Sequence, residues 1–111
     1  MSRDEDALLD IVEMIELIRK HGPRGEQELR EDVVRQAATI RWIEIIGEAA
    51  GRISDDLRAA NPDVPWQGVI GMRNVVAHGY DRVRLNIVWR VVDRELAPLE
   101  AQIRAILAEF E

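Results

Sequence analysis

The sequence contains no cysteine, only two histidines and few aromatic residues. Without cysteine it forms no disulfide bond and offers no thiolate ligand to a metal ion. The two histidines, His21 and His78, lack the close spacing of a zinc site, so we expect no metal and no cofactor. No apolar run approaches the roughly 20 residues of a membrane span, and the acidic N-terminus lacks a signal-peptide pattern. We therefore expect a cytoplasmic protein that does not contact a membrane.

The residue types that are abundant, together with the length of the chain, favour one small helical domain. Of the 111 residues 47% are hydrophobic, yet the aromatic ones are only three Trp, one Tyr and one Phe. At this length we expect a single domain over residues 1–111, and a second subunit would help to stabilise its small core. The net charge of −6 argues against general coating of nucleic acid. Residues 61–94, with five Arg and three Asp, are the only net-positive stretch.

Apolar residues recur at intervals of three and four along most of the chain, which is the spacing of amphipathic helices. The pattern predicts four main helices, over residues 4–20, 27–51, 65–78 and 85–111, and a short extra helix over residues 54–60. No alternating pattern indicates a β-strand. We therefore expect an all-α fold, an antiparallel up-and-down helical bundle.

Four single residues make this prediction more specific. Ser54 is a suitable N-cap for the short helix, and Gly79 is a suitable C-terminal cap after residue 78. Gly47 lies inside the second helix, where a glycine usually marks the close approach of another backbone, here another helix. Pro98 lies inside the last helix and predicts a kink or a break there. The second helix is apolar over most of its circumference, so we expect it to pack on several sides.

The segment RNVVAHGY, residues 73–80, carries most of the functional information. On an ideal helix Arg73 and His78 are separated by about 140° and ~7.5 Å, but both side chains can converge on a ligand beyond the helix end. Asn74 precedes His78 by four residues, so its amide can orient the imidazole. Arginine suits phosphate oxygens and histidine exchanges protons near neutral pH. This pair can therefore cleave RNA without a metal, because the neighbouring 2′-hydroxyl is an internal nucleophile.

Each residue of this segment also has a plainer interpretation. A histidine at a helix C-terminus often only stabilises the helix dipole. Arg73 can instead form an ion pair with a glutamate of a neighbouring helix. Tyr80, taken alone, is best interpreted as an amphipathic residue that seals the end of the bundle. Spacing alone leaves these interpretations open.

The segment resembles the R-x4-H signature of HEPN domains, and its longer form R-N-x-x-x-H-x-Y resembles the HepT branch of that superfamily. Two further stretches are similar to the same branch, IRWIEIIGEAAGRIS (residues 40–54) and PWQGVIGMRNVVAHGYDRV (residues 65–83). The start of the last helix, Val88-Trp89, fits as well. The resemblance extends over most of residues 5–110.

The resemblance implies a helical bundle that forms a homodimer, with the motif helices of both subunits lining one cleft. It implies the toxin of a prokaryotic toxin–antitoxin pair, a metal-independent endoribonuclease in which Arg73 and His78 are catalytic and Asn74 is a polar support. Glu48 and Arg41 match the family's second-helix pattern and are assigned supporting roles. The antitoxin would be an MNT-type nucleotidyltransferase, which neutralises the toxin by transferring AMP to Tyr80.

Two other hypotheses remain. The chain could be a catalytically inactive helical module that uses the same Arg–His–Tyr cluster to bind a nucleotidyltransferase partner or a nucleotide. It could also be a purely structural dimerising bundle, which the apolar circumference of the second helix favours.

Overall fold

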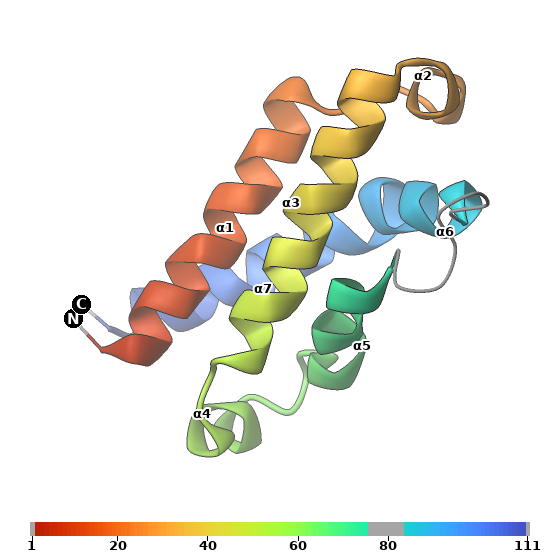
Figure 1. Cartoon of the computed structure of the whole chain (residues 1–111). Coiled ribbons are helices and arrows are strands. Elements are labelled where there is room, and N and C mark those ends of the chain that lie inside the picture. The colour runs from red at the N-terminus through yellow and green to blue at the C-terminus, as the bar shows by residue number, and fades with distance from the viewer. Residues whose placement is uncertain (1, 76–83, 111) are drawn as a thin grey trace.

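Figure 1 shows the computed structural model, which describes residues 2–75 and 84–110 of the chain. Its elements are α1 (Arg3–His21), α2 (Glu26–Glu31), α3 (Val33–Gly51), α4 (Asp55–Ala60), α5 (Trp66–Gly71), the 3₁₀ helix η1 (Met72–Asn74), α6 (Leu85–Arg90), the π-helical turn η2 (Val91–Glu95) and α7 (Leu96–Ala108). Within the described residues there is no β-strand, and no helix is both long and apolar enough to cross a bilayer. The predicted all-α bundle is confirmed.

The two longest helices, α1 and α3, run antiparallel side by side, and α7 packs across α1 (Figure 1). The predicted first helix is confirmed, since α1 begins and ends within one residue of the expected bounds. Fully buried aliphatic side chains from four helices fill the space between these elements: Leu8, Ile11, Ile43, Ile46, Val88 and Ile103.

The predicted second helix is wrong in one respect, because it is two helices and not one. The backbone at Asp32 is extended (φ −93°, ψ 96°), which separates α2 from α3. The Asp32 side chain accepts a hydrogen bond of 3.0 Å from the backbone N–H of Arg35, and this bond caps the start of α3. The same N–H lowers the pKa of Asp32 below its ordinary value. Asp32 thus ends α2 and begins α3.

The apolar circumference of α3 is covered at one end of the helix and open at the other. Ile43 and Ile46 are completely buried against the neighbouring helices. In contrast, Val33 and Val34 in the first turn expose 69% and 76% of their surface. The expectation that α3 packs on several sides therefore holds in its second half, whereas its first turn presents uncovered apolar surface in the single chain.

The short helix α4 begins as predicted, with Ser54 as its N-cap. The Ser54 hydroxyl accepts from the backbone N–H of Leu57 at 3.1 Å. Ser54 also donates twice to Asp4, from its backbone N–H at 2.8 Å and from its hydroxyl at 2.7 Å. The end of α3 and the start of α4 are thereby joined to the first turn of α1.

The last helix is distorted, as Pro98 predicts, but the distortion lies before the proline. Residues Val91–Glu95 form a π-helical turn, and the backbone N–H of Leu96 bonds to the Val91 carbonyl. In a regular helix the Pro98 ring would clash with the carbonyl of Arg94, and Arg94 lies inside this wider turn. The helix then continues through Pro98 to Ala108.

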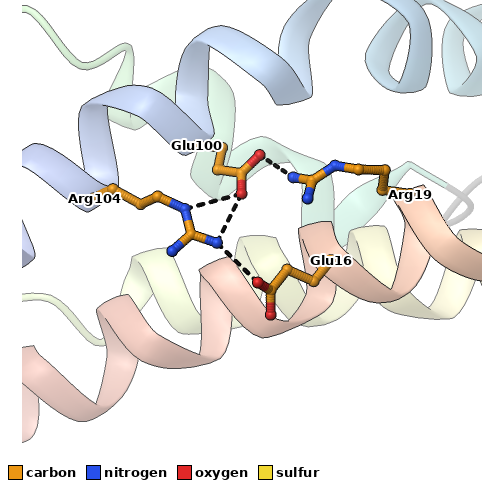
Figure 2. Close-up of polar contacts among 4 residues, drawn as sticks. All are labelled: Glu16, Arg19, Glu100 and Arg104. Atoms are coloured by element: carbon orange, nitrogen blue, oxygen red, sulfur yellow. Dashed lines mark hydrogen bonds and ion pairs between the residues drawn. The ribbon is translucent and has the colours of Figure 1, made fainter.

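A network of four charged side chains joins α1 to α7 (Figure 2). Arg104 donates to Glu16 at 2.8 Å and to Glu100 at 2.9 Å and 3.0 Å, and Arg19 also pairs with Glu100. The Glu100 side chain is only 14% exposed. Burial raises its pKa, but the hydrogen bonds from Arg19 and Arg104 together outweigh burial, so the pKa of Glu100 is lowered. Glu100 is therefore ionised and paired at neutral pH.

Candidate functional site

The structure describes the first part of the RNVVAHGY segment. Arg73, Asn74 and Val75 are described, whereas His78 and Tyr80 lie outside the described residues, as does the cap predicted at Gly79. The convergence of Arg73 with His78 and the contact between Asn74 and His78 therefore stay predictions. The described part of the site consists of Arg73, Asn74 and the elements that hold them.

The helix that carries Arg73 differs from the prediction. A single α-helix was expected over residues 65–78, but α5 ends at Gly71 and the chain continues as the 3₁₀ helix η1. The backbone N–H of Val75 bonds to the Met72 carbonyl at 3.2 Å, which is the i→i+3 bond of this tighter helix. Because a 3₁₀ helix has three residues per turn, the rotation calculated for an ideal α-helix does not apply at Arg73.

Buried apolar side chains anchor the segment on either side of the α5–η1 junction. Val69 and Met72 are 2% and 7% exposed. Trp66 is 7% exposed, and its indole N–H donates to the Asn61 carbonyl at 2.9 Å. These contacts fix the backbone of η1, while Arg73 and Asn74 project to the surface, where both are exposed.

Gly47 of α3 provides the surface against which η1 packs. A Cβ atom at Gly47 would lie 2.2 Å from the Arg73 backbone nitrogen and 2.9 Å from the Arg73 Cα, distances that no side chain can accept. The predicted close backbone approach at Gly47 is thus confirmed, and the partner is the 3₁₀ helix that carries Arg73. The absence of a side chain at position 47 lets the Arg73 backbone touch α3.

The Arg73 side chain extends along α3 by about one helical turn. A Cβ atom at Gly51 would lie 3.9 Å from Arg73 Nη1, which places the guanidinium beside the last residue of α3. Arg73 forms no ion pair with another residue among those described. The alternative in which a glutamate of a neighbouring helix neutralises Arg73 therefore has no support in the described part of the chain.

Gly51 was not identified as a site residue from the sequence, where it only marked the end of a helix. The signal that could have found it is its spacing from Gly47. Residues four apart lie on one face of a helix, so the close approach expected at Gly47 extends to Gly51.

The structure brings the two predicted supporting residues of α3 together. Arg41 Nη1 lies 3.5 Å from Glu48 Oε2 and also 3.5 Å from Glu44 Oε1. Arg41 and Glu48 are exposed, and Glu48 directly follows Gly47, the residue that η1 contacts. Within residues 2–75 and 84–110, no group of three or more His, Cys, Asp or Glu side chains is arranged to hold a metal ion.

Comparison with known proteins places the chain in a family. The family model described as "Ribonuclease HepT-like" matches residues 11–106. A Thermococcus cleftensis protein named "Probable ribonuclease HepT" is 33% identical over 103 residues, which cover 92% of this chain and 94% of that protein. No solved structure gives a significant match.

Two further relatives are named only as candidate RNases. One, from Caldanaerobacter subterraneus subsp. tengcongensis, is 35% identical over 81 residues, covering 73% of this chain and 72% of the relative. The other, from Methanocaldococcus jannaschii, is 30% identical over 111 residues, covering 98% and 92%. Because the family model matches residues 11–106, which are most of the chain, the chain belongs to the ribonuclease HepT-like family.

Proposed function

We propose that this protein is a metal-independent endoribonuclease whose catalytic residues are Arg73 and His78. The observation that carries the proposal is the environment of Arg73, whose exposed guanidinium lies beside the end of α3 and forms no ion pair within the described residues. An exposed, permanently charged fork of donors is suited to phosphate oxygens. Membership of a ribonuclease family supports RNA as the source of that phosphate.

The proposed reaction uses a nucleophile that the RNA itself supplies. His78 removes the proton from a ribose 2′-hydroxyl, and the 2′-oxygen forms a bond to the adjacent phosphorus. The bond from phosphorus to the 5′-oxygen of the next nucleotide breaks, that oxygen takes up a proton from water, and His78 returns its proton to the solvent. Arg73 stabilises the negative charge that develops on the phosphoryl oxygens. The products are a 2′,3′-cyclic phosphate and a 5′-hydroxyl.

Three further residues are assigned supporting roles in this proposal. Asn74 lies beside Arg73 in η1 and would hold the imidazole of His78 in one orientation. The ion pair of Arg41 with Glu48 keeps both charged groups on the surface of α3. There it would screen the carboxylate of Glu48 from the phosphate that Arg73 binds.

We also propose that the protein is the toxin of a toxin–antitoxin pair and that an MNT-type nucleotidyltransferase neutralises it. The Tyr80 hydroxyl would lose its proton to solvent and its oxygen would attack the α-phosphorus of ATP, forming tyrosyl-AMP as the bond to the leaving pyrophosphate breaks. The adduct adds bulk and negative charge two residues from His78, so it would repel an RNA phosphate. This system acts in the cytoplasm, where RNA and ATP are both present.

The proposed active form is a homodimer. The apolar patch at the start of α3, formed by Val33, Val34, Ala38 and Trp42, supports a second copy as its partner, since two of these residues are largely exposed in the single chain. Val34 to aspartate would place a charge in that interface and should yield a monomer in size-exclusion chromatography with light scattering. A dimer that persists in the Val34→Asp variant would place the interface elsewhere.

The decisive test of the ribonuclease is the variant His78→Ala. We expect it to lose RNA cleavage and growth arrest, because the 2′-hydroxyl keeps its proton. The matched control is His21→Ala, which removes the only other histidine of the chain, at the end of α1. RNA cleavage that survives in His78→Ala would contradict the catalytic role of His78, and a metal requirement in the parent protein would contradict the metal-independent mechanism.

The regulatory step has its own measurement. Incubation with the nucleotidyltransferase and ATP should add the mass of AMP to the peptide that contains Tyr80, and Tyr80→Phe should abolish that mass while RNA cleavage continues. Labelling of a different residue would rule out Tyr80 as the acceptor without affecting the proposed chemistry.

A further inference from the structure

The two glycines of α3 that face Arg73 make different contacts with it. At Gly47 the neighbouring atoms are the backbone and the Cβ of Arg73, within 2.2–3.0 Å of the position a Cβ would take. At Gly51 the only neighbour of that kind within 4 Å in the described structure is Arg73 Nη1, at 3.9 Å. Gly47 therefore fixes the backbone, whereas Gly51 adjoins only the charged end of the side chain.

The geometry of an α-helix explains why two glycines can perform these two tasks. Residues 47 and 51 lie on one face and are separated by about 6 Å along the axis. An extended arginine side chain has a similar length, so an Arg73 whose backbone rests at Gly47 can place its guanidinium at Gly51. Between them the helix presents a strip of surface without side chains, here called the glycine strip (Gly47 and Gly51).

We propose that the glycine strip positions the Arg73 guanidinium for phosphate binding, with Gly51 as a positioning residue that acts through Arg73. This inference rests on the proposed ribonuclease function and adds a residue to its site. A side chain at position 51 would point toward the helix N-terminus, which is the direction from which the Arg73 side chain arrives. Glycine at this position leaves that space to the arginine.

The first experiment uses Gly51→Leu to displace the guanidinium. We expect kcat for RNA cleavage to fall on the order of 100-fold, the loss typical of a catalytic group moved by about 1 Å, while the melting temperature stays close to that of the parent protein. The control is Gly68→Leu on α5, because a Cβ at Gly68 meets no atom within 4 Å and the residue is exposed. A Gly51→Leu variant with parental kcat would overturn the inference.

A second variant tests charge and also serves if the leucine variant does not fold. Gly51→Glu offers a carboxylate to the guanidinium at an exposed position, so it should compete with phosphate and weaken RNA binding. Gly68→Glu adds the same charge to α5 and measures the general repulsion of RNA. Equal losses in the two glutamate variants would show that position 51 has no special relation to Arg73.

A double-mutant cycle separates a positioning role from a structural one. Binding of a non-cleavable 2′-O-methyl RNA oligonucleotide is measured for the parent, Gly51→Leu, Arg73→Ala and the double variant. If Gly51 acts through Arg73, the leucine costs affinity only when Arg73 is present. An equal loss in both backgrounds would contradict the inference alone, whereas an Arg73→Ala protein that still cleaves RNA at the parental rate would contradict the proposed function.

Discussion

Arg104 and Arg73 are both arginines at the surface of the bundle, but their surroundings differ. Arg104 donates to Glu16 and Glu100, and its hydrogen bond to Glu100 is the main reason that its pKa is raised. The Arg73 backbone packs against Gly47, its guanidinium lies beside Gly51, and it forms no ion pair within the described residues. The charge of Arg104 joins α1 to α7, whereas the charge of Arg73 is paired with no other residue in the described part of the chain.

The largest expected effect is the difference in RNA cleavage between variants in which each of the two arginines is replaced by alanine, one at a time. Arg73→Ala is expected to lower kcat for RNA cleavage by about 10²–10³-fold, as removal of one group that stabilises a developing oxyanion does, with little change in thermal stability. Arg104→Ala should lower the melting temperature and leave kcat near the parental value. Cleavage assays and thermal unfolding on both variants measure the contrast.

Two results would contradict this contrast between Arg73 and Arg104. If Arg73→Ala lost as much thermal stability as Arg104→Ala, the guanidinium of Arg73 would be a structural cation like that of Arg104. If Arg104→Ala lost cleavage without losing stability, the α1–α7 network would belong to the site.

The next largest effect is expected at Gly47, against which the Arg73 backbone packs. Gly47→Ala should destabilise the protein by about 2–3 kcal/mol, because the methyl group meets the backbone of Arg73 and not a flexible side chain. In the control Gly68→Ala the added methyl group meets no atom within 4 Å. Its free energy of unfolding should rise by up to about 1 kcal/mol, because alanine has a better helix propensity than glycine. Urea unfolding of both variants gives the two free energies. A stable Gly47→Ala protein would mean that η1 can move away from α3.

The smallest effect concerns the α1–α7 network and its pH dependence. Glu100→Gln should lower the free energy of unfolding by about 1 kcal/mol at pH 7, since the Glu100 side chain is mostly buried and paired with two arginines. The pKa of Glu100 is lower in the folded protein than its ordinary value of 4.5, so its contribution is present above pH 4.5 and is lost as the pH falls through the lowered pKa. Urea unfolding should therefore show a difference at pH 7 that shrinks by pH 3. A difference that is equal at both pH values would argue against pairing as its cause.

Patterns that depend on neighbours in the sequence predicted most of the fold. The period of apolar residues located α1 and the last helix, and the residue types of Ser54 and Pro98 predicted a cap and a distorted helix. The break at Asp32 was missed because the apolar pattern continues across it. Its signal is local, since aspartate is a favoured N-cap and an apolar run follows it.

The site was less accessible to sequence reasoning for a physical reason. Gly47 predicted that some backbone approaches α3, but which backbone does so depends on how the chain folds back over about 25 residues. The change from α-helix to 3₁₀ helix occurs between two buried side chains, Val69 and Met72, and no residue type in the segment marks it. Residue type alone identified Arg73 and Asn74, whereas their support on α3 required the fold.

The hydrogen bonds between Ser54 and Asp4 have a consequence for local motion. They connect positions 50 residues apart, and the ion pair of Arg52 with Asp10 at 2.8 Å lies just beside them. The first turn of α1 therefore cannot fray without also releasing the chain directly after Gly51. Amide hydrogen exchange in these two segments should slow or quicken together, as one cooperative unit.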